Sequence, residues 1–229
     1  MSISNYSLAF LLEKNKEFVK NYEQNELMVL VKSHKMSDPK KRALLLDCIQ
    51  VFSNYFQKTV MLRSVLTENK MFLDIVQMHL AEEFGHDISL MNDRQNNPPK
   101  WDPILESCAC WFTWKMFTSD NIEKTLLVHL VLEASAHLFF KEAHRVMETF
   151  GETDYFKLHS ELDEHHETMG LDLLEGLREM DYQHLLVIQQ QGWDMLNAVC
   201  RRISELTIKA YDSQLSPELF QSTVDTRLG

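Results

Sequence analysis

The sequence is poor in the two residues that make turns. It holds only six glycines and five prolines among 229 residues, and its glycine share is under half of the roughly 7% that is typical of proteins. An all-β protein needs more of both residues for its turns. With 45% apolar and 25% charged residues, the composition predicts a globular all-α chain and excludes disordered and fibrous proteins.

The sequence also lacks features of secreted, membrane-spanning and nucleic-acid-binding proteins. It has no CxxC pair, no basic region ahead of its first apolar run, and no apolar stretch of the roughly 20 residues that span a bilayer. Acidic residues exceed basic ones by 34 to 23, for a net charge of −11, which repels phosphate backbones and anionic membrane surfaces. We therefore expect a cytoplasmic protein whose four cysteines are reduced core residues, with neither nucleic acid nor a membrane as partner.

Prolines and capping residues divide the chain into helices. Asp38-Pro39, Asp102-Pro103 and Ser216-Pro217 each pair an N-cap residue with proline at the first helical position. Apolar residues recur every three or four positions near the C-terminal end, as on one buried face of a helix. The pattern predicts a single-domain bundle of about seven helices over residues 1–229. The expected helices cover about 6–35, 39–66, 70–93, 103–117, 121–151, 154–177 and 185–210.

Two segments carry the same spacing of histidine and acid. His79, Glu83 and His86 follow the pattern His-x3-acid-x2-His, and the pattern recurs 80 residues later. The second copy consists of His159, Asp163 and His166. On continuous helices each set lies along one face, so two such helices facing each other would direct acids and imidazoles at a shared point. We expect a metal site there.

Glu133 is the third candidate carboxylate. It lies in the strongly apolar segment Leu126–Ala136, with His129 and Ser135 as its polar neighbours. An unpaired buried carboxylate is strongly unfavourable, so Glu133 should be protonated, hydrogen bonded or bound to a cation. His137 lies one turn further along the same face.

These residues form a ligand set for two metal ions. Three carboxylates leave a residual charge of +1 against two divalent cations, and mixed imidazole and carboxylate ligation suits iron, with manganese as the alternative. His79 and His137 share the ligand faces and would orient ligands. The expected ligands are Glu83, His86, Glu133, His159, Asp163 and His166.

Three fragments of the sequence resemble a known family. HLAEEFGHD, LVLEASAHLFF and YFKLHSELDEHHETMG, between Met78 and Gly170, are similar to the three ligand segments of the heme-oxygenase-like di-iron oxidases. That family shares its fold with heme oxygenase, the thiaminase-II-like proteins and pyrroloquinoline-quinone synthase. Some members place the first acid seven residues before the histidine, where this chain has His79. Which of His79, Glu82 and Glu83 completes the first ligand segment therefore stays open.

The resemblance implies a function and a cofactor. It implies two Fe(II) ions, O2 as co-substrate, and oxidation of a small organic acid or amine held between the helices. Relatives with this fold are often dimers, so a homodimer is compatible with it. Two other functions remain open. One is a ferritin-like metal oxidase or storage protein, and the other is a metal-free thiaminase-II-like hydrolase or binding module, which needs a reactive cysteine near an acid.

The remaining singled-out residues have structural interpretations. His129 is expected to be an ordinary packing histidine. Gly85 inside a helix costs about 1 kcal/mol relative to alanine, which suggests close approach by another helix or by the substrate. An aromatic group is interpreted as core packing; it consists of Trp111, Phe112, Trp114 and Phe117.

Overall fold

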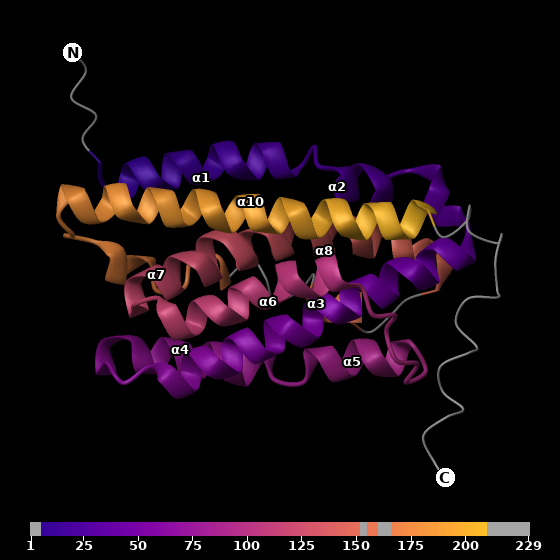
Figure 1. Cartoon of the computed structure of the whole chain (residues 1–229), viewed down its shortest axis with the longest axis horizontal. Helices are drawn as coiled ribbons and strands as arrows, with labels where there is room; N and C mark the ends of the chain where they lie inside the picture. The colour runs from indigo at the N-terminus through magenta and orange to yellow at the C-terminus, as the bar shows by residue number, and fades with distance from the viewer. Residues whose placement is uncertain (1–5, 152–154, 160–165, 210–229) are drawn as a thin grey trace, which may run out of the picture.

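The computed structural model describes residues 6–151, 155–159 and 166–209. Within these ranges the backbone forms helices, turns and loops and no strand, which confirms the all-α prediction. The long helices run along a common direction in an elongated bundle (Figure 1). The α-helices are α1 (Leu8–Tyr22), α2 (Glu26–Val31), α3 (Pro39–Leu66), α4 (Lys70–Glu83), α5 (His86–Asp93), α6 (Pro103–Thr118), α7 (Asn121–Thr125), α8 (Ala134–Met147) and α10 (Glu179–Lys209).

Shorter helical segments connect some of these helices. Three are 3-10 helices: η1 (His34–Ser37), η3 (Glu148–Phe150) and η4 (Leu171–Leu174). The fourth, η2 (Leu126–Glu133), is a π-helix between α7 and α8. A π-helix is rare and is found frequently at functional sites, and η2 ends at the candidate ligand Glu133.

The capping residues start the helices as predicted. Asp38 accepts a hydrogen bond from the backbone nitrogen of Lys40, and Asp102 accepts one from that of Leu105. Asp120 and Glu123 form a capping box at the start of α7. Proline is the first residue of both α3 and α6. The Ser216-Pro217 start lies outside the described residues.

The third predicted helix is broken where one continuous element was expected. Gly85 adopts a left-handed conformation with φ of +92°, which ends α4 and starts α5. Its backbone nitrogen donates to Oε1 of Gln57 at 2.8 Å. A Cβ atom built on Gly85 would meet none of the described atoms within 4 Å. Glycine is therefore required here for its backbone conformation, and the expected close approach was wrong.

Two other helices were also predicted to be longer than they are. The first expected helix is interrupted at residues 23–25, where Asn25 caps α2. The sixth was expected to reach residue 177, but residues 167–170 form a turn in which Gly170 has φ of +75°. In both places an asparagine or a glycine offers the backbone an alternative to the helix.

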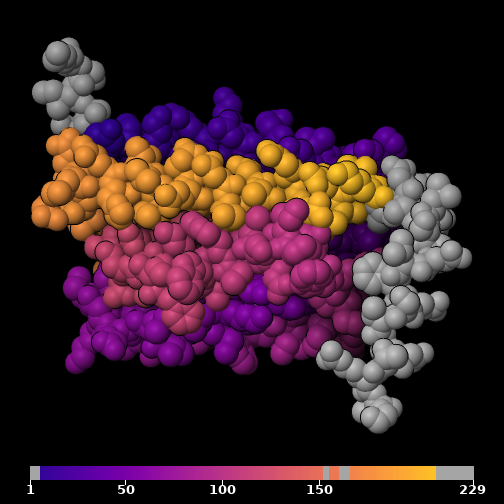
Figure 2. All heavy atoms as spheres, viewed as in Figure 1, coloured from indigo at the N-terminus to yellow at the C-terminus, as the bar shows by residue number. Residues whose placement is uncertain are grey.

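Helix α10 packs against α1, α6 and η2. Figure 2 shows it as a continuous band along one face, between α1 and α6. Asn15 of α1 accepts hydrogen bonds from Gln189 and Trp193 of α10, at 2.9 Å and 3.0 Å. A Cβ on Gly192 would lie 2.8 Å from Leu127 Cδ2, so glycine permits close packing of α10 on the π-helix.

Part of the aromatic group on α6 is exposed. Phe112 is buried as predicted. Trp114 and Phe117, however, are 60% and 57% exposed, so their interpretation as core residues was wrong. They lie outside the face of α6 that carries the buried residues Ala109, Phe112 and Met116. Dense apolar character along a whole helix does not reveal which face is buried.

The four cysteines differ in burial. All four cysteines are free; Cys48 and Cys200 are buried, and Cys108 and Cys110 are half-buried. Among the described residues, no helix is long and apolar enough to cross a membrane.

An ion pair fixes α10 to the start of α6. Arg202 donates to both carboxylate oxygens of Asp102, at 3.0 Å and 2.6 Å. These bonds outweigh the effect of burial and hold the pKa of Asp102 below its usual value. Because the folded pKa is lowered, the pair stabilises the fold above the unfolded pKa of about 3.9, and this stabilisation is lost as pH falls through the folded pKa.

Asp102→Asn isolates this ion pair, because asparagine is also a good N-cap residue. We expect it to lower the free energy of unfolding by roughly 1.5–3 kcal/mol near neutral pH. The difference from wild type should shrink as the pH falls below about 4. Urea denaturation between pH 3 and pH 8 measures both effects. Asp181→Asn, at the exposed pair with Arg178, is the control. A difference that does not depend on pH would contradict the assignment.

Candidate metal centre

Histidines and carboxylates from distant parts of the sequence come together inside the bundle. His79 and Glu83 lie at the end of α4, and His86 is the first residue of α5. Glu133 is the last residue of η2. The remaining two residues, His159 and His166, lie in the helical residues described around the gap at 160–165. His86 is half-buried and the other five are buried.

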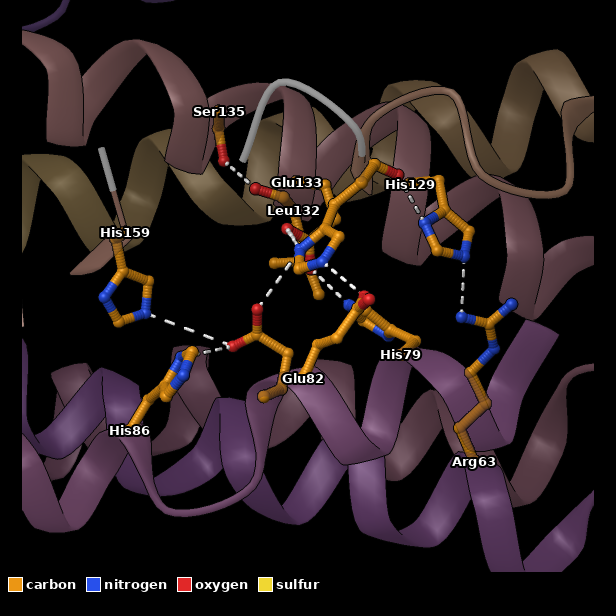
Figure 3. Close-up of polar contacts among 11 residues, drawn as sticks. Arg63, His79, Glu82, His86, His129, Leu132, Glu133, Ser135 and His159 are labelled. Atoms are coloured by element: carbon orange, nitrogen blue, oxygen red, sulfur yellow. Dashed lines mark hydrogen bonds and ion pairs between the residues drawn. The ribbon is translucent and has the colours of Figure 1, made fainter. Parts of the chain in front are cut away.

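The cluster consists of two groups that share one carboxylate. The inner group is His79, Glu83, Glu133 and His166, and the outer group is Glu83, His86 and His159. In each group, one ligand atom per residue lies within 4.8 Å of every other. Figure 3 shows His86 and His159 on one side of the cluster, with Glu133 and His79 on the other. Glu83 thus belongs to both groups.

The distances within the cluster are short. In the inner group, His79 Nε2 lies 2.8 Å from Glu133 Oε1, and His166 Nδ1 lies 3.2 Å from Glu83 Oε1 and 3.5 Å from Glu133 Oε2. In the outer group, Glu83 Oε2 lies 3.0 Å from His86 Nδ1 and 4.0 Å from His159 Nε2. Both oxygens of Glu83 therefore face imidazole nitrogens, one in each group.

Several of these buried atoms lack a hydrogen bond of good geometry within the described part of the chain. They are both carboxylate oxygens of Glu83 and the Nδ1 atoms of His79, His86 and His166. Buried polar atoms are nearly always satisfied, and unsatisfied ones call for an explanation such as an ion. Nitrogen and oxygen atoms that converge without bonding to one another fit a cation between them.

The buried carboxylates are held in their charged form. Burial raises the pKa of Glu83, but His166, His86 and His159 outweigh it and keep that pKa well below its usual range. Burial likewise raises the pKa of Glu133, while His79 and His166 bring it below its ordinary value. Burial lowers the pKa of His166, and the two carboxylates raise it to about 11. Without metal, a protonated His166 balances part of the negative charge.

His159 is oriented as a ligand. Its Nδ1 lies 2.8 Å from the backbone carbonyl of Tyr155, so Nδ1 carries the proton and donates it. This leaves the lone pair of Nε2 directed to the side of Glu83. The ring is held between Phe140 and Tyr155, with centroid distances of 4.2 Å and 4.3 Å. Burial lowers the pKa of His159, which favours the neutral imidazole that metals require.

Five of the six predicted ligands meet in this cluster. They are Glu83, His86, Glu133, His159 and His166. The sixth, Asp163, lies outside the described residues. His79, expected to orient a ligand or to complete the first ligand segment, belongs to the inner group. His137 is half-buried on α8 and belongs to neither group. Glu82, the open alternative to Glu83, is in neither group, although its Oε2 lies 2.9 Å from His166 Nε2.

Two residues behind the cluster were missed by sequence reasoning. His129 is fully buried, and its ring centroid lies 5.1 Å from that of His79. Arg63 on α3 is 1% exposed and contacts His129 (Figure 3). A lone arginine in the apolar stretch Val60–Leu66 is the signal that could have indicated Arg63, because arginine is almost never fully buried without a partner.

A cavity of about 70 Å³ adjoins the cluster. Glu83, Glu133 and His159 line it on the side of the cluster. The rest of its wall is mainly aliphatic and aromatic, with contributions from α3, α8 and α10. No lysine or arginine lines it among the described residues. A space of this size holds several water molecules or a small organic molecule.

Comparisons with known proteins agree with this architecture. No protein-family model matches the chain. An uncharacterized protein of Rickettsia prowazekii (strain Madrid E) is 34% identical over 197 residues, which cover 86% of this chain and 94% of that protein. A domain of unknown function from Shewanella denitrificans OS217, whose crystal structure has a heme oxygenase-like fold, matches with a TM-score of 0.65. At 15% identity, the match covers 97% of this chain and 98% of that one.

The structural match extends over nearly the whole of both chains, so it concerns the complete helical arrangement rather than one helical pair. The fold implied by the ligand segments is thereby confirmed. The match in sequence is long enough to establish common descent with the rickettsial protein. The chain therefore belongs to the same family as this Rickettsia protein, and it has a heme oxygenase-like fold.

Proposed function

We propose that this protein is a non-heme di-iron oxidase that uses O2 to oxidise a small organic substrate. The observation that carries the proposal is Glu83, whose two oxygens face two separate groups of buried ligands. A carboxylate shared in this way is suited to a pair of ions, and mixed imidazole and carboxylate ligands suit iron or manganese. When bound, two iron ions supply the electrons that reduce O2 and the oxidising power that acts on the substrate.

The residues of the cluster would bind different ions. Glu83 would hold both ions, His79, Glu133 and His166 the inner one, and His86 and His159 the outer one. Asp163 is a further ligand proposed from the sequence. The anionic carboxylates offset the charge of the ions as their oxidation state changes. His166, protonated without metal, has to release that proton before its nitrogen can bind an ion.

The cavity supports an organic substrate of mainly apolar character. Phe52, Phe56, Phe139 and Ile203 are among the residues of its wall, and these side chains exclude water from the space beside the ions. Since no cationic side chain of the described residues lines it, a substrate carboxylate would have to be held by the metal ions themselves. A ferritin-like function, with iron as substrate, gives no role to an apolar cavity of this kind.

The metal-free alternative requires a reactive cysteine, and Cys200 is the cysteine that lines the cavity. Burial raises the pKa of this thiol to about 12. Its sulfur lies 3.9 Å from the hydroxyl of Tyr22, which is also buried. A thiol this far from ionisation is a poor nucleophile at neutral pH. The environment of Cys200 therefore argues against a thiaminase-II-like hydrolase.

Anaerobic loading with Fe(II) tests the proposal. We expect about two iron ions per chain, as the two ligand groups require, and a transient in the ultraviolet-visible spectrum when O2 is added. His159→Ala and Asp163→Ala should each lower the iron content and suppress the transient. His144→Ala on α8, which changes a histidine outside both groups, is the control. If the His159 and Asp163 variants bind iron as well as wild type, the assignment of the site is wrong.

A further inference from the structure

Arg63 is a buried cation with neutral hydrogen-bond partners. Its guanidinium donates from Nη1 to His129 Nε2 at 2.8 Å and from Nη2 to Thr125 Oγ1 at 3.2 Å. No carboxylate among the described residues forms an ion pair with it within 4.0 Å. Burying a charge without a counter-ion costs several kcal/mol. A residue that destabilises the fold to this extent calls for a role beyond packing.

The hydrogen bonds around His129 have a single allowed direction. Arginine donates only, so Nε2 of His129 accepts and carries no proton. Nδ1 therefore carries the proton and donates to the backbone carbonyl of His166 at 2.8 Å. The result is a directed chain from the guanidinium through the imidazole to the backbone of a ligand residue. Arg63 thus selects the tautomer of His129 that can hold His166.

This chain ends at the inner group. The ring of His166 lies between Glu83 and Glu133, at 3.2 Å and 3.5 Å from their oxygens. The ring of His79 packs against both His129 and His166, with centroid distances of 5.1 Å to each. Neither Arg63 nor His129 contacts the described residues His86 and His159 of the outer group. Figure 3 shows Arg63 and His129 on the side of the cluster away from His159.

We infer that Arg63 and His129 are positioning residues for the inner metal ion: they hold the backbone of His166 so that its imidazole faces Glu83 and Glu133. The inference rests on the proposed function, because it requires that metal bind. Partners that orient a metal ligand typically change metal affinity by about 10–100-fold when they are removed. The effect is confined to the ion of the inner group, because the hydrogen-bond chain reaches only His166.

Anaerobic titration with Co(II), followed by its visible absorption bands, measures the two sites separately. His86→Ala removes a ligand of the outer group alone and assigns the bands. His129→Phe keeps a ring of similar size but loses both hydrogen bonds, and should weaken cobalt at the inner site about 10–100-fold with the outer site unchanged. His129→Asn places an amide nitrogen where Nδ1 was, so it should restore much of the inner affinity. His144→Phe on α8 is the matched control.

The outcomes separate this inference from the proposed function. If wild type binds no cobalt, both fail. If wild type binds at both sites and His129→Phe binds equally well, only the role of Arg63 and His129 is wrong. A loss at both sites alike, without rescue by His129→Asn, would mean a general structural effect and would also overturn it. Should His129→Phe not fold, Arg63→Met decides: inner affinity must fall and outer affinity must stay.

Discussion

Glu83→Gln is expected to abolish stoichiometric binding of both metal ions. The change keeps the size of the side chain, but it removes the negative charge and replaces one oxygen by an amide nitrogen, which cannot ligate. Because the two groups share Glu83, the inner and outer ions each lose a ligand. Other ligand substitutions, such as His86→Ala, should remove one ion and leave the second. Metal content after anaerobic loading and gel filtration measures the difference.

Two further substitutions sharpen this test. Glu82→Gln changes the neighbouring acid, which is in neither group and is 37% exposed, and should retain both ions. Glu142→Gln, at the surface pair with Arg145, controls for the loss of one charge. Retention of one ion per chain by Glu83→Gln would show that Glu83 does not bridge. If Glu82→Gln loses metal and Glu83→Gln does not, the bridging role belongs to Glu82 and our assignment to Glu83 is wrong.

Trp193→Ala is expected to be the most destabilising single change in the core. Its side chain is 1% exposed and packs against Phe18 and Tyr22 of α1, with centroid distances of 6.2 Å and 5.7 Å. The indole nitrogen donates to Asn15 at 3.0 Å. Truncation leaves a cavity and removes the link between α1 and α10. A buried tryptophan of this kind contributes about 3–5 kcal/mol to the free energy of unfolding.

Urea denaturation followed by circular dichroism measures this loss. Trp114→Ala is the matched control, because Trp114 is 60% exposed and surface substitutions usually change stability by less than about 0.5 kcal/mol. Gel filtration should show whether the Trp193 variant remains folded. Equal effects of the two substitutions would contradict the assignment of Trp193 to the core between α1 and α10.

The helices were predictable from local signals, and their interruptions were less so. The Asp-Pro pairs at 38–39 and 102–103 set the starts of α3 and α6, because capping and proline act on neighbouring residues. At Gly85 the sequence predicted a helical glycine with a close neighbour, where the structure has a break between α4 and α5. What decides it is the bond from its backbone to Gln57, which is 28 residues away in the sequence. The π-helix at 126–133 likewise left no recognised signal in the sequence.

The residues of the cluster were predictable for a different reason. A carboxylate or imidazole at helical spacing in an apolar segment contradicts the pattern around it, and such conflicts between local sequence and burial are expected at functional sites. Glu133 among aliphatic residues is the clearest case. His129 lies in the same apolar segment as Glu133, whereas His79 lies in the repeat beside Glu82 and Glu83. The roles of both histidines depend on which residues of other helices lie beside them. Neighbouring residues in the sequence do not contain that information.

The sequence by itself determined the all-α class, the main helix starts and five candidate ligands that meet in one cluster, because periodicity, capping and buried polarity depend on neighbouring residues. Only the tertiary structure decided that Glu83 is shared between two groups, that His79 joins the inner group, and that Arg63 supports His129. These three facts depend on distances between α3, α4, η2 and the segment that ends at His166. Packing brings those elements together, and no local pattern specifies it.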